Sequence, residues 1–266
     1  MTPLLLASLV AASASIDFRP LEPGLELAEV QLPVRSSVGD STVTVLRIDP
    51  ARFSLTLLAA APSTGSRSRT ARAWVRNHGL AAAVNAGMFE PGGKPTGFAR
   101  KGSAVLNGRW KAGYQAALAF GPRKEGLPAV RILDKDCDGD LQVASAGYEH
   151  VVQSIRMIDC RRRNAWGVRK QRYSSVIAAV DTRGRLLLLH CRSPFVMHDY
   201  IAQLLSLSAL DLQRALYLEG GPEASLYVEA GGRQVQRVGS FETGFNENDE
   251  NRELWDLPNV IGVRRR

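Results

Sequence analysis

The chain has 266 residues, 45% hydrophobic and 23% charged, a composition typical of a globular protein and incompatible with long disordered stretches. Its formal net charge of +8 favours anionic partners such as phosphates, nucleic acid or lipid head groups, with a solvated basic surface as the alternative. No apolar run reaches the roughly 20 residues that span a bilayer, so we predict no stable membrane insertion.

The chain begins with a short apolar run that ends in Ala12-Ser13-Ala14, as in an export signal with a small-residue cleavage site. No Lys or Arg precedes the run, and a mis-chosen start codon or a buried N-terminal segment is the alternative. No cysteine follows it, which argues against a lipoprotein anchor. We predict that residues 1–14 are a signal peptide and that the protein is secreted or periplasmic.

The hydrophobic pattern predicts many strands and two helices. Alternating or continuous apolar runs predict strands over residues 25–34, 41–49, 52–60, 80–84, 114–120, 127–133, 150–154, 174–180, 186–190, 215–219, 226–229, 235–238 and 259–263. Helical spacing predicts one helix over 70–78, ended by Gly79, and another from about Asp199 to about Leu210. Because there are no repeats and no linker, we predict one α+β domain over 15–266, with a curved, mixed or mostly antiparallel sheet and a few packed helices.

Several connecting segments carry recognisable signals. Residues 62–66 read as a loop, and Asn107-Gly108 is typical of a two-residue hairpin turn. Residues 181–184 are expected to join two strands of a second hairpin. Residues 134–140 have the D-x-D-x-D-G spacing of a calcium loop, but Ser145 stands where the bidentate Glu belongs. We therefore expect a solvated acidic turn there, and no metal site.

The chain has three cysteines: Cys137, Cys160 and Cys191. An exported protein can hold one disulfide and leave one thiol. We predict that Cys137 pairs with Cys160, although the sequence does not fix the pairing. No cysteine or histidine cluster has zinc spacing, so no structural zinc is expected.

Two unusual turns follow predicted strands. The strand over 215–219 ends in Glu219, and Gly220-Gly221-Pro222 then allows close backbone approach and leaves amides free for a ligand. The strand over 80–84 leads into Asn85-Ala86-Gly87-Met88-Phe89, where Asn85 can both donate and accept hydrogen bonds. The alternatives are a plain hairpin with a solvated Glu219, and a tight turn with Met88 and Phe89 in the core.

Other motifs are weaker. His198-Asp199 at a helix start is either a base with its orienting carboxylate or, as we favour, a helix-cap pair. The basic loop over 156–172 has no accompanying recognition motif, so we predict no nucleic-acid partner. The absence of a G-x-S-x-G elbow disfavours an α/β-hydrolase.

Four motifs in order resemble those of the phosphodiester glycosidase family. Asn85 to Phe89 resembles its N-x-G-x-F turn, and Gln153-Ser154 resembles its Q-S step. Arg172-Tyr173-Ser174 and the 181–184 turn resemble its R-x-[ST/A] strand and D-x-x-G turn. Leu218 to Leu226 resembles its L-D-G-G-x-S-[ST]-x-L signature, and the similarity covers about residues 80–230.

The resemblance implies hydrolysis of the glycosidic C–O bond of a sugar-1-phosphodiester, without a cofactor. It implies that Glu219 is the catalytic carboxylate, with Glu223 as its partner, and that Arg172 binds the phosphate. The residues expected to hold the sugar or the phosphate are Asn85, Gly87, Met88, Ser154, Ser174, Gly220, Gly221 and Ser225.

The chain departs from the family pattern at this signature. Glu219 stands where the family has Asp, and Pro222-Glu223-Ala224 replaces the residues that usually follow the glycines. The extra methylene moves the carboxylate by about 1.5 Å, and a misplacement of about 1 Å can lower a rate roughly 10²-fold. The alternative to a hydrolase is therefore an exported, non-catalytic module that binds an anionic glycan or cell-wall polymer.

Overall fold

The computed structural model describes residues 15–60 and 67–266. The predicted signal peptide over 1–14 and the predicted loop over 62–66 lie outside the described residues. The described chain forms three sheets in which all the paired strands are antiparallel, together with a few short helices. The predicted single α+β domain with mostly antiparallel sheet is therefore confirmed.

The largest sheet has seven strands and begins at one edge with the N-terminal hairpin. In spatial order they are β1 (Arg19–Glu22), β2 (Leu25–Gln31), β3 (Thr42–Ile48), β13 (Leu186–Val196), β12 (Arg172–Asp181), β14 (Leu212–Gly220) and β11 (Arg156–Ile158). The predicted hairpin across residues 181–184 is confirmed, because it joins β12 to β13.

The other two sheets have five strands each. One contains, in order, β7 (Ala104–Asn107), β6 (Ala99–Lys101), β10 (Tyr148–Ser154), β8 (Ala116–Pro122) and β9 (Val130–Asp134). The other contains β16 (Arg233–Val238), β15 (Ser225–Ala230), β5 (Ala82–Asn85), β17 (Asn259–Arg265) and β4 (Phe53–Ala59). The chain therefore enters a different sheet when it passes from β14 to β15.

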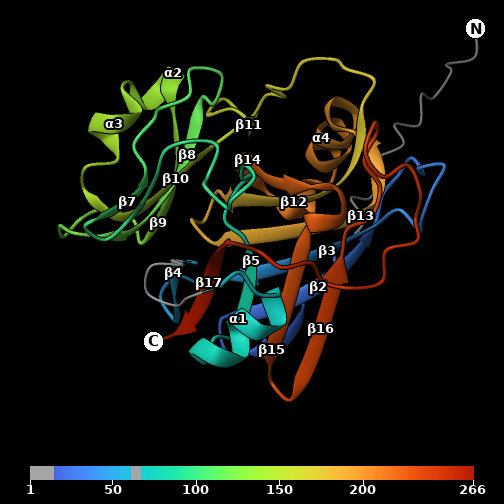
Figure 1. Ribbon diagram of the computed structural model, residues 1–266, viewed down its shortest axis with the longest axis horizontal. Coiled ribbons are helices and arrows are strands. Elements are labelled where there is room, and N and C mark those ends of the chain that lie inside the picture. The colour runs from blue at the N-terminus through green and yellow to red at the C-terminus, as the bar shows by residue number, and fades with distance from the viewer. Residues whose placement is uncertain (1–14, 61–66) are drawn as a thin grey trace, which may run out of the picture.

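The helices cover the outer faces of these sheets (Figure 1). They are α1 (Ala71–His78), α2 (Lys135–Asp138), α3 (Leu141–Ala144) and α4 (Met197–Ser206), with 3-10 turns η2 (Ser208–Leu210) and η3 (Gly221–Glu223). The hydroxyl of Thr70 caps α1 by accepting from the Ala73 amide, and Gly79 ends the helix in a left-handed conformation. This confirms the predicted helix over 70–78. None of the helices in the described ranges is long and apolar enough to cross a membrane.

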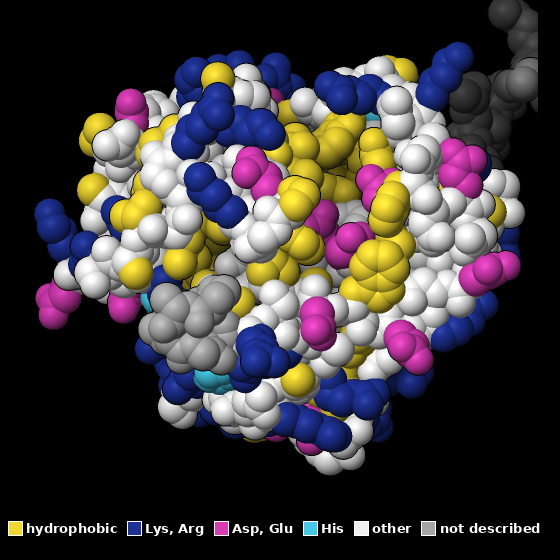
Figure 2. Space-filling model, in the orientation of Figure 1, with side chains coloured by type: hydrophobic (Ala, Val, Ile, Leu, Met, Phe, Trp, Pro, Cys, Tyr) yellow, Lys and Arg dark blue, Asp and Glu magenta, His cyan; other side chains and the backbone are white. Residues whose placement is uncertain are grey.

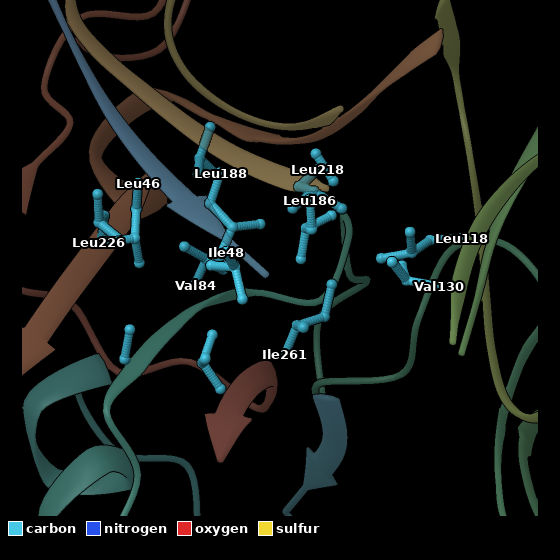
Figure 3. Close-up of a cluster of buried hydrophobic side chains, with 14 of the residues drawn as sticks. Leu46, Ile48, Val84, Leu118, Val130, Leu186, Leu188, Leu218, Leu226 and Ile261 are labelled. Atoms are coloured by element: carbon cyan, nitrogen blue, oxygen red, sulfur yellow. The ribbon is translucent and has the colours of Figure 1, made fainter. Parts of the chain in front are cut away.

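One hydrophobic core joins all three sheets (Figure 3). Leu188 and Leu218 reach it from the seven-stranded sheet, Leu118 from the β8 sheet, and Val84 and Ile261 from the β5 sheet. All five side chains are fully buried. The apolar face of each sheet is covered by the other two sheets. The sheets therefore depend on one another to bury their apolar side chains.

The seven-stranded sheet is buried on both faces at its centre, which explains the continuous apolar run in β13. Leu186 and Leu188 point into the shared core, whereas Leu187 and Leu189 point to a second cluster under α4. The α4 residues in that second cluster are Met197, Tyr200, Ile201 and Leu204.

Two predictions about connecting segments are wrong. The turn between β6 and β7 lies at Gly102-Ser103, and Asn107 instead ends β7, where its side-chain amide donates to the Pro95 carbonyl (2.7 Å). The 134–140 segment is not a solvated turn, because Asp134 is buried against the Arg156 guanidinium (2.6 Å). In both segments the partner lies outside the local stretch, 12 residues away for Asn107 and 22 residues away for Asp134, so the local pattern does not reveal it.

The predicted disulfide between Cys137 and Cys160 is confirmed, and Cys191 is a buried free thiol in β13. The disulfide ties α2 to the loop that follows β11, across a sequence separation of 23 residues. It therefore connects the β8 sheet to the seven-stranded sheet.

We expect the Cys137→Ser/Cys160→Ser double variant to have a free energy of unfolding about 2–4 kcal/mol lower than the wild type, because the unfolded chain regains loop freedom. Urea denaturation with and without reductant measures the change. Reductant should destabilise the wild type and leave the double variant unaffected. If the urea midpoint of the wild type is the same with and without reductant, the disulfide has no structural role.

Candidate active site

The two unusual turns of the sequence lie next to each other in the structure. Asn85 ends β5, Glu219 lies next to the end of β14, and η3 carries the chain from β14 into β15. Because β15 pairs with β5, η3 lies against the end of β5. Figure 2 shows acidic side chains in a hollow on this face, surrounded by hydrophobic side chains, with Lys and Arg side chains above it.

Three carboxylates gather at this place: Glu219, Glu223 and Glu242, the last from the loop between β16 and β17. An added Cβ on Gly221 would lie 2.5 Å from Glu242 Oε2 and 3.4 Å from Glu223 Oε2. The carboxylates of Glu223 and Glu242 therefore close around the Gly221 backbone. All three side chains are partly accessible to solvent.

Burial raises the pKa of Glu219 well above its usual range, and the charges of Glu223 and Glu242 raise it further. One hydrogen bond from the Gly220 amide (3.1 Å) acts in the opposite direction. Burial also raises the pKa of Glu223 and the pKa of Glu242. Each of these carboxyls therefore ionises less readily than it would in an exposed position.

Positive charge does not neutralise these carboxylates directly. Within residues 15–60 and 67–266, no Lys, Arg or His forms an ion pair with Glu219, Glu223 or Glu242. Over the same ranges, no group of three His, Cys, Asp or Glu side chains is arranged to hold a metal ion. Desolvated acids with raised pKa values in a hollow are characteristic of groups that transfer protons.

Two tyrosines border the carboxylates. Tyr217 of β14 is buried, and burial raises the pKa of its hydroxyl well above the usual range, with smaller contributions from the three carboxylates and Tyr173. Burial also raises the pKa of Tyr173, and the charge of Glu242 adds to the effect. Both phenols are therefore hydrogen-bond donors next to the acids.

The Gly-Gly pair is needed because neighbouring groups occupy the space of a side chain. A Cβ on Gly220 would collide with the Tyr217 hydroxyl, and Gly221 has a φ of 64° in the left-handed region. The sequence predicts that these glycines let a ligand approach the backbone closely. The approaching groups, however, belong to the protein itself.

Asn85 joins the two turns through its side chain. Its Nδ2 donates to the Glu223 carbonyl (3.0 Å), and its Oδ1 accepts from the Ser225 amide (2.8 Å). The Ser225 hydroxyl donates to the same Glu223 carbonyl (2.9 Å). The sequence predicts that Asn85 and Ser225 contact the substrate. In the structure the Asn85 amide and the Ser225 hydroxyl instead hydrogen-bond to the backbone that carries Glu223.

Ser154 and Ser174 likewise bond to backbone groups. The Ser154 hydroxyl donates to the Tyr217 carbonyl, which attaches the end of β10 to β14. The Ser174 hydroxyl accepts from the Ser240 amide (2.9 Å) and the Phe241 amide (3.1 Å) and donates to the Arg192 carbonyl. Ser174 therefore positions the segment that leads to Glu242.

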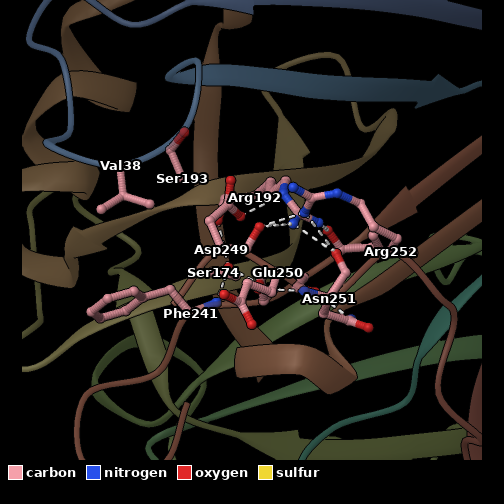
Figure 4. Close-up of polar contacts among 12 residues, drawn as sticks. Val38, Ser174, Arg192, Ser193, Phe241, Asp249, Glu250, Asn251 and Arg252 are labelled. Atoms are coloured by element: carbon pink, nitrogen blue, oxygen red, sulfur yellow. Dashed lines mark hydrogen bonds and ion pairs between the residues drawn. The ribbon is translucent and has the colours of Figure 1, made fainter. Parts of the chain in front are cut away.

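Arg192 holds the rest of that segment (Figure 4). Its guanidinium donates to the carbonyls of Val238 (3.1 Å), Asp249 (3.1 Å) and Asn251 (2.7 Å), and it forms an ion pair with the Asp249 carboxylate (2.7 Å). The loop that places Glu242 over η3 is thus fixed at both of its ends.

The remaining predicted site residues lie around the cluster. The Arg172 guanidinium donates to the Ser37 hydroxyl (2.8 Å) and stacks over the Phe241 ring, 5.2 Å from its centroid. Phe241 is the residue before Glu242. Gly87 has a φ of 109°, and Met88 contacts the Tyr114 hydroxyl through its sulfur (3.9 Å). Met88 also packs against the hydrophobic cluster that contains Tyr217.

The histidines serve different roles. His198 and Asp199 lie 3.5 Å apart at the exposed start of α4, but Val196 is the N-cap and no side chain forms a cap hydrogen bond, so the predicted helix-cap role of this pair is wrong. His190 is buried in β13, where its Nε2 hydrogen-bonds to the Ala224 carbonyl (3.1 Å). Burial lowers the pKa of His190 to about 4, so the imidazole that hydrogen-bonds to the residue after η3 is neutral.

Sequence reasoning missed Glu242. It belongs to a C-terminal stretch of mixed character, and no motif surrounds it. Its position follows from the backbone bonds to Ser174 and from a bridge to Tyr173, both roughly 70 residues away in the chain. No local signal in the sequence reports such a contact.

Comparison with known proteins identifies the family. The sequence profile described as phosphodiester glycosidase matches residues 78–264, a range that contains both turns and Glu242. Because the match covers most of the chain, the protein belongs to the phosphodiester glycosidase family. No curated protein sequence matches the chain significantly.

Two solved structures share the fold. A hypothetical protein from Synechocystis has a TM-score of 0.64 at 16% identity, over 96% of this chain and 65% of its own length. The zebrafish N-acetylglucosamine-1-phosphodiester alpha-N-acetylglucosaminidase catalytic domain, auto-inhibited by its pro-peptide, has a TM-score of 0.57 at 12% identity. That alignment covers 98% of this chain and 87% of the zebrafish domain. At these identities the comparison shows the fold alone.

Replacing Asn85 by Ala should lower the free energy of unfolding by about 2–5 kcal/mol, because a buried carbonyl and a buried amide each lose a partner. Urea denaturation measures the loss. Asn77→Ala, at an exposed position in α1, is the matched control and should change stability little. Equal effects of the two substitutions would show that Asn85 does not fix the turn.

Glu219→Gln should become more stable relative to the wild type as pH rises. Because the pKa of Glu219 is raised in the folded state, its carboxyl favours folding below the unfolded pKa, and this contribution is lost as pH rises toward the folded pKa. A pKa that is higher by one in the folded state than in the unfolded state corresponds to about 1.4 kcal/mol. Thermal unfolding between pH 4 and pH 9 measures the difference.

The control for that series is Glu125→Gln, at an exposed position between β8 and β9. It shows how much of any pH dependence comes from a Glu→Gln change at the surface. If the stability difference between Glu219→Gln and the wild type changes with pH no more than the difference for Glu125→Gln, Glu219 has an ordinary pKa in the folded protein.

Proposed function

We propose that the protein hydrolyses the glycosidic bond of a sugar-1-phosphodiester. The observation that carries this proposal is the cluster of three desolvated carboxylates: Glu219 and Glu223 lie on the family signature, and Glu242 reaches them from the loop between β16 and β17. Hydrolysis at the anomeric carbon needs a proton donor and a carboxylate near an oxocarbenium-like transition state.

The raised pKa of Glu219 suits the role of proton donor. In the proposed reaction its carboxyl protonates the oxygen between the anomeric carbon and the phosphorus while the C–O bond breaks. Glu223 and Glu242, in their ionised forms, supply negative charge for the oxocarbenium ion. One of these carboxylates takes the proton of the attacking water, which leaves a free sugar and a phosphomonoester.

The surrounding residues would bind and orient the substrate. A protonated Glu219 removes one negative charge that would repel the phosphodiester, and Arg172 beside Phe241 adds positive potential. The hydroxyls of Tyr217 and Tyr173 and the backbone at Gly87, Gly220 and Gly221 are the proposed contacts for sugar hydroxyls. Asn85, Ser154, Ser174 and Ser225 act indirectly, by fixing the backbone.

We further propose that the protein is exported and that residues 15–266 form the mature domain. The apolar run and Ala12-Ser13-Ala14 support an export signal. The Cys137–Cys160 disulfide adds support, since disulfides persist mainly in oxidising compartments.

A second candidate function is an exported module that binds an anionic glycan without cleaving it. The departure at Pro222-Glu223-Ala224 and the Glu in place of the family's Asp favour it. In this case the carboxylates would only bind, and their pKa values would have no catalytic consequence.

Incubation of the purified protein with a panel of sugar-1-phosphodiesters distinguishes the two functions. The wild type should release free sugar, and Glu219→Gln should lower kcat by about 10²-fold or more with little change in affinity. The Glu125→Gln control should match the wild type. Saturable binding without release of sugar from any compound would favour the binding module.

A further inference from the structure

A cavity of about 410 Å³ lies between the segment over 113–115, the start of β11 and the loop that follows β11. Its lining includes Tyr114, Ile155, Arg156, Trp166 and Arg169. No sequence motif assigns a role to Trp166, and Arg169 stands out in the sequence only as part of a basic loop.

The cavity borders the carboxylate cluster through aromatic contacts. The Trp166 ring lies 5.5 Å from the Tyr217 ring, measured between centroids, and both rings belong to one hydrophobic cluster with Met88. The Tyr217 hydroxyl in turn occupies the place that a Cβ on Gly220 would take, directly after Glu219 in the chain, and the Glu219 charge adds to the raised pKa of that hydroxyl. Tyr217 therefore lies between the Trp166 side of the cavity and the strand end that carries Glu219.

Backbone bonds hold the Trp166 side of the cavity in place. The Ala165 amide donates to the Met157 carbonyl of β11 (2.9 Å), and the Trp166 amide donates to Asn164 Oδ1 (3.1 Å). Asn164 also donates from Nδ2 to the His198 carbonyl at the start of α4 (2.8 Å). Trp166 is thus positioned by two elements before any ligand arrives.

The two arginines of the cavity differ in the charge they can offer. Arg156 is held by the carboxylates of Asp134 (2.6 Å) and Asp136 (2.7 Å), which offset its charge. Arg169 is exposed and forms no ion pair with any residue in the described ranges. Its charge also reaches Tyr173, where it opposes the raised pKa caused by burial and Glu242.

We propose that this cavity is the aglycone subsite, in which Arg169 binds the phosphodiester group and Trp166 stacks on a flat ring of the aglycone, either a pyranose face or a nucleobase. The inference rests on the proposed function. Arg169 suits this role better than Arg172, whose guanidinium already bonds to Ser37 and stacks on Phe241. A cavity of this volume holds much more than a phosphate, and a guanidinium and an indole face match the two halves of such a group.

Binding of non-hydrolysable analogues tests the subsite independently of turnover. In these C-glycosidic phosphonates a CH2 group replaces the bridging oxygen, and the ester carries a methyl, a hexose or a nucleoside. Isothermal titration calorimetry on the full chain compares the wild type with Arg169→Gln, Trp166→Leu and the control Arg161→Gln, an exposed loop arginine that does not line the cavity.

Arg169→Gln should weaken all three analogues by about 10- to 100-fold, the usual effect of losing a hydrogen bond to a charged group. Trp166→Leu should weaken the hexose or the nucleoside ester by about tenfold and leave the methyl ester unchanged. The ester that responds more identifies the aglycone. Trp166→Phe, which keeps an aromatic face, should restore most of the affinity and guards against misfolding.

An Arg169→Gln variant that binds like Arg161→Gln would overturn the phosphate role of Arg169. A Trp166→Leu variant that weakens the methyl ester as much as the others, or a wild type that binds none of the analogues, would overturn the subsite. A wild type that binds the analogues as expected but never hydrolyses a phosphodiester leaves the subsite intact and refutes only the proposed hydrolysis.

Discussion

The candidate site depends on the contact between the Asn85 side chain and the backbone of Glu223 and Ser225. Between β14 and β15 the chain leaves one sheet for another, so the backbone groups of η3 cannot continue a strand ladder. Buried backbone groups need partners, and Asn is a side chain that can donate and accept at once. The contact fixes the turn that carries Glu223, directly after the strand that carries Glu219.

The carboxylates on this turn are held together against their own repulsion. Their burial and mutual charge disfavour ionisation, so the folded state keeps them close only because other contacts fix the backbone. Arg192 and Ser174 hold the segment with Glu242, and His190 supports η3 as a neutral imidazole. Arg192 thus acts on the backbone of the loop, and no basic side chain of the described residues forms an ion pair with the acids.

The departures from the family signature make sense as parts of one arrangement. Glu219 is longer than the Asp of the family pattern, and Glu223 comes from the altered stretch after the glycines. Both face the same small space as Glu242, with Gly221 between Glu223 and Glu242. In our proposal the site is re-tuned around three glutamates, and the neighbouring cavity with Arg169 supplies the positive charge that the acids lack.

Local pattern determined the helix over 70–78, the hairpin across 181–184, the positions of most strands and the two turns, because side-chain periodicity and glycine conformation act within a few residues. It did not reveal the short strands β1 and β11, and β11 lies in the predicted basic loop. It misplaced the turn near Asn107, whose side chain bonds to Pro95 instead. Only the tertiary structure brought Glu242 to Glu219 and turned Asn85, Ser174 and Ser225 into backbone supports. Those roles depend on contacts between segments that are distant in the chain. The hydrophobic core that the three sheets share brings these segments together, and no local stretch of sequence encodes it.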